Sequence, residues 1–332
     1  MLLVNETDVP ELAALLTAAL EDVAAVIEQQ LTSELPSVNR LCRHIERYRG
    51  KMLRPTLVIL CGVAARGETQ GNSPLSRDHV VAAAVTELIH MATLVHDDVL
   101  DESRIRRRAA TINALYGNEM AVMLGDYLIS NAFALCSSLG QPAINQALGR
   151  VTNTLCEGEL LQLYNRDHLS IDEATYLEIV TRKTASLIGE ACALGAEISR
   201  ADVNVVAALR SAGQDLGVAF QIQDDLLDLI GKERLVGKSL GLDLEKGKLT
   251  LPFILYLAEA SPQQRGEMLR LIEQREAAKA SRELIESGSI EQAQQRAADR
   301  VRRACAELSL LPPGPGRDML LRLAQRIIDR ET

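Results

Sequence analysis

The sequence predicts an all-α fold, and three observations support this prediction. Alanine and leucine are abundant, whereas the 332 residues include only 6 Tyr, 3 Phe and no Trp, so helix formers outnumber strand formers. Only Pro142 lies between Pro74 and Pro252, which leaves long stretches without a helix breaker. Some middle segments, such as 80–95, are apolar nearly all round, which is typical of a helix inside a bundle.

Helical periodicity and the placement of Gly and Pro define the elements of the N-terminal half. We expect helices over 8–31, 37–48, 54–65, 78–101, 119–138 and 143–163. Gly50 separates the second of these from the third, and the loop over 67–76, which contains Gly, Ser and Pro, separates the third from the fourth. Gly117 and the segment 140–142 give the remaining breaks.

The C-terminal half has the same character and fewer breaks. We expect helices over 172–198, 201–231, 250–259, 262–274, 277–287, 290–308 and 317–330. A long loop over 231–249 and the segment 312–316, which contains Pro and Gly, interrupt them. No repeat of fixed period, low-complexity tract or long polar linker divides the chain, so we expect a single domain over residues 1–332.

Bulk properties exclude several classes of protein. An apolar content of 47% excludes disorder, and a formal net charge of −9 argues against a nucleic-acid-binding surface. We expect no signal peptide and no transmembrane segment, because the longest apolar candidate, 55–65, is shorter than the roughly 18 residues that span a bilayer. Six scattered cysteines without a C-x-x-C pair indicate buried thiols in a reducing compartment, so we expect a cytoplasmic protein.

An acidic cluster ends the apolar helix expected over 78–101. It reads Asp97-Asp98-Val99-Leu100-Asp101, and at about 100° per residue Asp97 and Asp101 lie on one face, one turn apart. Burying such carboxylates is costly unless a positive charge lies between them. Mg²⁺ fits, because it typically takes one or two carboxylates together with phosphate oxygens of a substrate.

The same D-D-x-x-D spacing recurs in a second apolar helix, as Asp224-Asp225-Leu226-Leu227-Asp228. Gln221 shares the polar stripe of this cluster. Either cluster alone is as consistent with a solvated helix face as with a metal site. Two copies of one spacing on apolar helices favour a magnesium site that binds a polyphosphate.

Basic residues gather near both clusters in the sequence. Arg104, Arg106, Arg107 and Arg108 follow the first cluster, Lys51 and Arg54 begin an expected helix, Lys183 lies in another, and Lys238 and Lys248 follow the second cluster. Each alone is more typical of a solvated face, but together they could hold phosphate oxygens. His90 lies two turns before Asp97 on the same face, where a core histidine and a site residue are both reasonable interpretations.

These residues resemble the trans-isoprenyl diphosphate synthases, or polyprenyl synthetases, over roughly Arg40 to Pro252. The matching segments are Gly50–Pro55, Glu87–Arg107, Gly125-Asp126, Glu157-Gly158-Glu159, Arg182-Lys183-Thr184, Phe220–Asp228 and Gly237–Pro252. The resemblance implies an isoprenoid-synthase helical bundle around a deep central cavity, usually a homodimer. It implies a prenyltransferase that condenses isopentenyl diphosphate with an allylic diphosphate to give an all-trans polyprenyl diphosphate.

The resemblance also implies roles for individual residues. The metal ligands would be Asp97, Asp101 and Asp224, with Asp98, Asp225 and Asp228 as supporting ligands of Mg²⁺. Isopentenyl diphosphate would contact Lys51, Arg54, His90 and Arg107, and the allylic partner would contact Arg106, Lys183, Thr184, Gln221 and Lys238, with Lys248 less certain. Catalysis would depend above all on Asp97, Asp101, Lys183 and Asp224. Met52 and Leu242 depart from the family pattern, which usually has an arginine and often an acidic residue there.

Product length depends in this family on residues just before the first aspartate motif. Ala92 and Thr93 are small there, so we expect a product longer than C20, as from an octaprenyl diphosphate synthase. Phe133 could form a deeper floor, or it could be an ordinary core aromatic. A short-chain farnesyl or geranylgeranyl synthase is the alternative.

Three other classes of protein share some of these features. A class I terpene cyclase would need Asn and Ser in the second motif and would not need the pair Lys51 and Arg54. An HD-type phosphohydrolase is suggested by His96-Asp97, with His79 or His90 as a further ligand, but it leaves the repeated motif unexplained. A non-catalytic subunit with the same fold would be expected to lose one aspartate motif.

Overall fold

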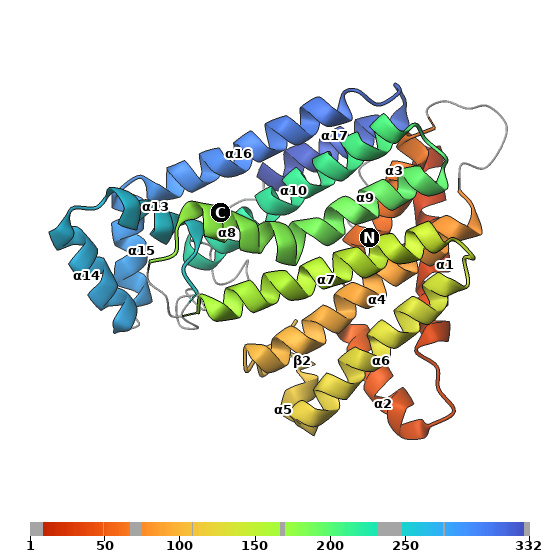
Figure 1. Cartoon of the computed structure of the whole chain (residues 1–332), viewed down its shortest axis with the longest axis horizontal. Helices are drawn as coiled ribbons and strands as arrows, with labels where there is room; N and C mark the ends of the chain where they lie inside the picture. The colour runs from red at the N-terminus through yellow and green to blue at the C-terminus, as the bar shows by residue number, and fades with distance from the viewer. Residues whose placement is uncertain are drawn as a thin grey trace. The chain divides into compact units, whose positions relative to one another are not determined.

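The computed structural model describes residues 9–48, 50–66, 75–107, 109–166, 170–230, 248–274 and 276–328, without the side chains of residues 47, 277 and 278. Nearly all of these residues are helical (Figure 1), so the all-α prediction is confirmed. The expected helices and the observed ones agree to within a few residues at most ends. The predicted residue Lys238, the departure Leu242 and Arg108 lie outside the described residues.

The elements follow one another along the chain with short connections. The N-terminal helices are α1 (Pro10–Gln30), α2 (Pro36–Ile45), α3 (Leu53–Ala64), α4 (Arg77–Leu100), α5 (Ile112–Tyr116), α6 (Asn118–Ser137) and α7 (Pro142–Tyr164). The C-terminal helices are α8 (Glu173–Val180), α9 (Ser186–Ile198), α10 (Val203–Ile230), α13 (Leu251–Glu259), α14 (Pro262–Glu273), α15 (Ala277–Glu286), α16 (Ser289–Leu308) and α17 (Pro315–Ile328). A 3₁₀ turn over Glu46–Tyr48 extends α2.

Three local features were not expected from the sequence. Residues Ile105–Arg106 and Ala109–Ala110 form a small antiparallel hairpin, in which Ile105 pairs with Ala110. The short helix α5 follows, and its N-cap Thr111 accepts a hydrogen bond from the backbone N–H of Ala114. Residues Thr181–Ala185 form a π-helical segment between α8 and α9, a rare irregularity that is frequent at functional sites.

The chain divides into two compact units, which are described separately. The first comprises 1–152, 190–210 and 307–321, and the second comprises 153–189, 211–306 and 322–332. Helices α7, α9, α10, α16 and α17 contribute residues to both.

Helix α4 is the central element of the first unit. It packs against α1, α3 and α6 (Figure 1), and its residues from Val81 to Ile89 are buried with no polar side chain except Thr86 and Glu87. This explains the apolar run in the sequence and anchors the acidic segment at the end of the helix.

Helices α4 and α6 are long and apolar enough to cross a membrane, judged by length and composition only. Within the described structure 72% of the apolar window of α4 is buried, as for a core helix, but only 39% of that of α6. Exposed apolar residues gather on α6 and the adjoining α5, and they include Leu115, Tyr116, Met120, Val122 and Met123.

Candidate functional site

The first acidic segment ends α4, and its middle carboxylate is held by the protein. Asp98 is 1% exposed. Its Oδ1 accepts a hydrogen bond from Arg106 Nε at 2.9 Å and forms an ion pair with Nη2 of the same residue at 2.8 Å. Its backbone carbonyl accepts a hydrogen bond from the side chain of Asn113 at 3.0 Å. Asp97 and Asp101 are half-buried instead. Asp98 therefore fixes the hairpin that follows α4 and leaves the flanking aspartates on a more accessible face.

Tyr48 connects this segment to the neighbouring arginines. Its hydroxyl accepts a hydrogen bond from the backbone N–H of Ile112 at 3.2 Å, and its backbone carbonyl accepts one from Arg107. The guanidinium of Arg106 lies 5.9 Å from the centre of the ring. Burial, and next the charge of Asp98, raise the pKa of Tyr48, so the phenol stays protonated beside that carboxylate.

Sequence reasoning did not identify Tyr48. The only available signal was a lone aromatic residue within the polar stretch 43–51, in a chain with 9 Phe and Tyr residues in total. Burial of that residue to 1% exposure depends on the hairpin and α5, neither of which was expected.

A basic cluster lies close to the same hairpin and is formed by Arg54, Arg106 and Arg107 around His90. Burial lowers the pKa of His90 well below its ordinary value, and the charges of Arg54, Arg107 and Arg106, in that order, lower it further. His90 is therefore neutral near pH 7. Burial likewise lowers the pKa of Arg54, and Glu87 opposes this effect.

The cluster presents hydrogen-bond donors to an anion. Arg54 Nε is buried and has no hydrogen-bond partner among the described residues, which is unusual for a group of this polarity. Arg54 lies in the first turn of α3, where backbone N–H groups also favour an anion. Lys51 is exposed just before this turn. Of the residues predicted to bind isopentenyl diphosphate, the structure thus brings Arg54, His90 and Arg107 together.

Backbone geometry around this cluster is unusual. Met52 and Arg107 have positive φ values of 54° and 50°, which few non-glycine residues adopt. A Cβ atom on Gly50 would lie 2.6 Å from Nη2 of Arg107. A larger residue at this position would therefore displace the guanidinium of Arg107 from where it now lies.

The second acidic segment lies in α10 and has the same internal arrangement. Asp225 is buried, and its Oδ2 accepts a hydrogen bond from the Tyr176 hydroxyl at 2.6 Å while its Oδ1 accepts one from Gln221 Nε2 at 2.9 Å. Thr184 Oγ1 donates to Gln221 Oε1 at 3.1 Å. Asp224 is exposed and Asp228 is half-buried. The structure therefore joins Thr184, Gln221 and Asp225 in one network and adds Tyr176, which was not predicted.

Lys183 lies in the π-helical segment, and two glycines allow the close packing of this segment. A Cβ atom on Gly158 of α7 would lie 2.6 Å from the backbone nitrogen of Lys183. A Cβ atom on Gly217 of α10 would lie 2.6 Å from Cα of Ala185. The side chain of Lys183 forms an ion pair with Glu159. Gly158 and Glu159 thus fix both the backbone and the ammonium group of Lys183.

The donor chemistry of both acidic segments suits Mg²⁺ rather than a metal held by protein alone. Within the described ranges, no group of three or more His, Cys, Asp or Glu side chains is arranged to hold a metal ion. Asp97, Asp101 and Asp228 are half-buried and Asp224 is exposed, so the flanking carboxylates are the more accessible candidate ligands in each segment. Mg²⁺ fits this pattern because it usually completes its octahedron with water and phosphate oxygens.

Two of the histidines that a phosphohydrolase could use, His79 and His96, lie within hydrogen-bonding distance of other parts of the protein. His79 is fully buried, and its Nε2 lies 3.0 Å from Ser199 Oγ and 3.2 Å from the carbonyl of Gly195. Burial lowers its pKa to about 4. The Nε2 of His96 lies 3.2 Å from the carbonyl of Val122. These contacts identify His79 as a core histidine.

Comparison with known proteins agrees with this arrangement of acidic and basic groups. The sequence model of the polyprenyl synthetase family matches residues 36–287. The chain belongs to the polyprenyl synthetase family. It is therefore a prenyltransferase, and membership of this family removes the phosphohydrolase and cyclase interpretations.

The relatives include enzymes of different product length. The chain is 36% identical over 313 residues to the octaprenyl diphosphate synthase of Escherichia coli, covering 93% of this chain and 95% of the relative. It is 33% identical over 299 residues to a short chain isoprenyl diphosphate synthase of Methanothermobacter thermautotrophicus, covering 88% and 90%.

Solved structures confirm the isoprenoid-synthase helical fold. A decaprenyl diphosphate synthase from Rhodobacter capsulatus superposes with a TM-score of 0.88 at 35% identity, covering 97% of this chain and 98% of that one. A polyprenyl synthase from Caulobacter crescentus, solved with calcium and isoprenyl diphosphate, gives a TM-score of 0.87 at 33% identity and covers 98% and 99%.

Proposed function

We propose that this polyprenyl synthetase family member is an Mg²⁺-dependent enzyme that condenses isopentenyl diphosphate with an allylic diphosphate to give an all-trans polyprenyl diphosphate longer than C20. The observation that carries the proposal is the basic cluster around His90, which adjoins the first acidic segment through Arg106. One helix end thus offers carboxylates for cations, and guanidinium groups for an anion lie beside it. A diphosphate substrate needs both.

The accessible carboxylates of the two segments are the proposed metal ligands. Asp97, Asp101 and Asp224 would be the principal ligands and Asp228 an occasional one. Asp98 and Asp225 are bonded to Arg106, Gln221 and Tyr176, which favours a supporting role for them. Bound Mg²⁺ would stabilise the negative charge that develops on the departing pyrophosphate. One of the similar solved structures contains calcium, which supports a divalent cation as the proposed cofactor.

Isopentenyl diphosphate is the proposed ligand of the basic cluster. Its two phosphate groups would take the N–H donors of Arg54 and Arg107, together with Lys51 and the neutral imidazole of His90. Met52 stands where the family usually has arginine, so the cluster has one cation fewer than usual. We expect a weaker affinity for isopentenyl diphosphate as the consequence.

The allylic diphosphate is assigned to Lys183, Thr184 and Gln221, with Arg106, Lys238 and Lys248 as further contacts. The ion pair of Lys183 with Glu159 and the hydrogen bond between Thr184 and Gln221 hold these side chains in defined positions before substrate binds. Preorganised donors stabilise charge in a transition state without the cost of reorienting them. No protein base is needed if the released pyrophosphate takes the proton.

Product length is proposed from the residues before the first aspartate motif. Ala92 and Thr93 have small side chains, so neither is expected to stop an elongating tail. Ala92 is fully buried, and Thr93 Oγ1 donates to the carbonyl of His90 in its own helix at 2.8 Å. Phe133 is half-buried on α6 and is the candidate for a deeper floor. A short-chain product remains the alternative, because relatives of both kinds match the chain.

We also propose a cytoplasmic homodimer in which each chain is a single synthase domain over 1–332 with a deep central cavity. The exposed apolar residues of α5 and α6 support self-association, because several exposed apolar side chains on two adjoining helices would be covered in a dimer. The family match over 36–287 supports the single domain.

The test is an incubation of purified protein with Mg²⁺, isopentenyl diphosphate and farnesyl diphosphate, with product length measured by mass spectrometry. Products beyond C20 support the proposal in full. A single addition that stops at C20 would reject the long-chain assignment and keep the chemistry. No elongation from farnesyl or shorter starters would reject the proposed reaction. EDTA should abolish turnover, and added Mg²⁺ should restore it.

A further inference from the structure

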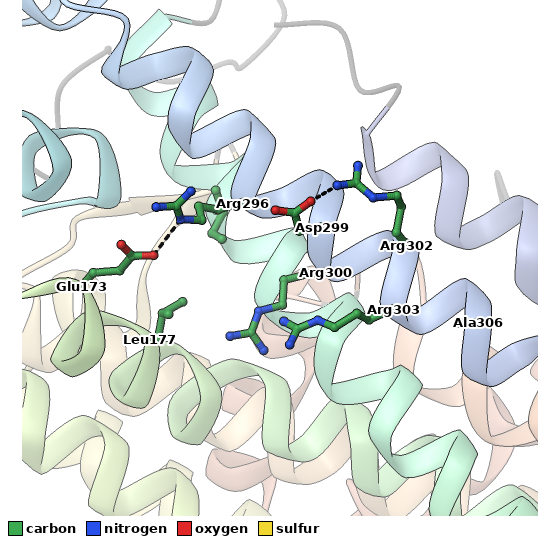
Figure 2. Close-up of a pocket in the computed structure, with 9 residues that line it drawn as sticks. Glu173, Leu177, Arg296, Asp299, Arg300, Arg302, Arg303 and Ala306 are labelled. Atoms are coloured by element: carbon green, nitrogen blue, oxygen red, sulfur yellow. Dashed lines mark hydrogen bonds and ion pairs between the residues drawn. The ribbon is translucent and has the colours of Figure 1, made fainter.

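A pocket of about 590 Å³ lies in the second unit, between α8, α10 and α16. Four arginines of α16 line it together with Glu173, Leu177, Ile222, Asp299 and Ala306 (Figure 2). We call it the α16 arginine pocket. None of its residues belongs to the sites assigned above.

Three of its arginines share one face of α16. Arg296, Arg300 and Arg303 are spaced four and three residues apart, so their side chains lie on successive turns of the same helix face. Figure 2 shows the guanidinium groups of Arg300 and Arg303 next to each other at the pocket. Arg302 lies on a different face and pairs with Asp299 of its own helix.

The carboxylates at the pocket leave arginine donors to spare. Arg300 Nη1 and Arg303 Nη2 contact the same oxygen, Asp215 Oδ1, at 2.8 Å and 3.3 Å. Arg296 Nε donates to Glu173 Oε1 at 2.9 Å. Because each guanidinium carries five N–H groups, two of them on one carboxylate oxygen retain donors for a further oxyanion. The side chain of Arg303 is 57% exposed and can turn toward a ligand.

Charge and lining define the class of ligand. Among the described residues the four arginines meet Glu173, Asp215 and Asp299, and the charge of Glu259 also acts on Arg296, so the pocket offers spare guanidinium N–H donors more than a net positive charge. Leu177, Ile222 and Ala306 supply apolar surface at the same place. An oxyanion head with an apolar group attached would use both parts of the lining, whereas a metal ion or an uncharged molecule would not.

We propose that the α16 arginine pocket binds a phosphate- or diphosphate-bearing molecule that carries an apolar group. The pocket meets α8 at Leu177, next to Tyr176, and α10 at Ile222, next to Gln221. A ligand in the pocket would therefore lie close to the residues whose hydrogen bonds hold Asp225. The choice of isoprenoid diphosphates as probes rests on the proposed function, but the binding of the head group does not.

The absence of tryptophan from the chain permits a direct binding assay. Ala306 is exposed on α16, so Ala306→Trp introduces a single fluorescent reporter at the pocket. Titrations would use inorganic pyrophosphate and farnesyl diphosphate, with EDTA present to suppress binding at the aspartate segments. We expect a saturable change in emission with both probes. Tighter binding of farnesyl diphosphate would identify an isoprenoid ligand, and equal affinity would identify a free oxyanion, contrary to the proposed apolar group.

Two further substitutions separate the pocket from general electrostatics. Arg303→Ala in the reporter protein should weaken binding about tenfold, the usual effect of losing one charge-assisted contact, and it keeps the pair between Arg300 and Asp215. Arg282→Ala removes the same charge from an exposed position of α15 that does not line the pocket, and it should change affinity less than twofold. No saturable signal, or equal losses in both variants, would overturn the proposal. Elongation activity of the reporter protein, measured separately, shows whether the proposed reaction itself fails.

Discussion

Replacing Tyr48 by phenylalanine tests whether this residue organises the first acidic segment and the basic cluster. The change removes only the hydroxyl, which accepts the backbone N–H of Ile112 at 3.2 Å and lies beside Asp98. Ile112 is 1% exposed, so its N–H would lose its partner without access to water. A buried donor left unpaired costs about 1–3 kcal/mol.

Two measurements should change together. The free energy of unfolding in urea should fall by about 1–3 kcal/mol, because Ile112 starts α5 next to the hairpin. The KM for isopentenyl diphosphate should rise by roughly tenfold, equivalent to about 1.4 kcal/mol, because the hydroxyl lies beside Asp98, which holds Arg106 and with it the hairpin that carries Arg107. The kcat should change less, since the aspartates are untouched.

The exposed Tyr116 offers a matched control, because Tyr116→Phe removes the same hydroxyl from a residue that is 39% exposed. We expect a change within about 0.5 kcal/mol there. A Tyr48→Phe protein as stable as this control would refute the assigned hydrogen bond. A stability loss with unchanged KM would show that Tyr48 supports the fold and does not position the arginines.

Three more predictions follow from single contacts. Gly158→Ala should cost about 1–3 kcal/mol of stability and much of the activity, because the new Cβ would lie 2.6 Å from the backbone nitrogen of Lys183. Gly149→Ala in the same helix is the control, because its Cβ meets nothing within 4 Å. It should stabilise the protein by up to about 1 kcal/mol, and urea unfolding measures both changes. Tyr176→Phe should lower kcat, since Asp225 loses its hydrogen bond at 2.6 Å; unchanged kinetics would remove that residue from the site. Burial gives His79 a native pKa of about 4, against an unfolded value of about 6.5. The neutral imidazole therefore leaves the unfolding free energy unaffected above pH 6.5, and that free energy falls by at most about 3 kcal/mol as the pH drops toward 4. His79→Gln should flatten this dependence of the unfolding free energy on pH.

The helices could be predicted because their signals are local. Prolines stand at the first position of α1, α2, α7, α14 and α17, where the missing N–H is not needed. The side chain of Asp172 caps α8 by accepting the N–H of Thr175 at 2.8 Å. Periodicity gives the rest of each helix, so the predicted and observed bounds differ by no more than three residues at either end, apart from the π-helical interruption at Thr181–Ala185.

The segment between α4 and α6 was not predicted because its structure depends on distant partners. Residues 101–111 are polar and lack any period, yet Arg106 is drawn to Asp98 and Thr111 Oγ1 donates to the carbonyl of Ser103 at 2.7 Å. The π-helical segment at Thr181–Ala185 has no signal of its own either. It becomes intelligible only from Gly158 and Gly217, which lie far away in the sequence and provide the space.

Sequence spacing alone explains why the middle aspartate differs from its neighbours in both motifs. At about 100° per residue the first and last aspartates of D-D-x-x-D differ by about 40°, whereas the second lies about 100° from the first. On a helix whose remaining sides are apolar, that rotation turns the second carboxylate toward the protein, where it needs donors to compensate burial.

The structure supplies such donors twice, from unrelated residues. Asp98 accepts a hydrogen bond from Arg106 and lies beside Tyr48. Asp225 accepts hydrogen bonds from Gln221 and Tyr176. In each segment one carboxylate is thus used to fix the helix, and the flanking pair stays accessible. The repeated motif is therefore two copies of one arrangement, in which a buried aspartate with protein donors fixes the helix beside the two aspartates that we propose as metal ligands.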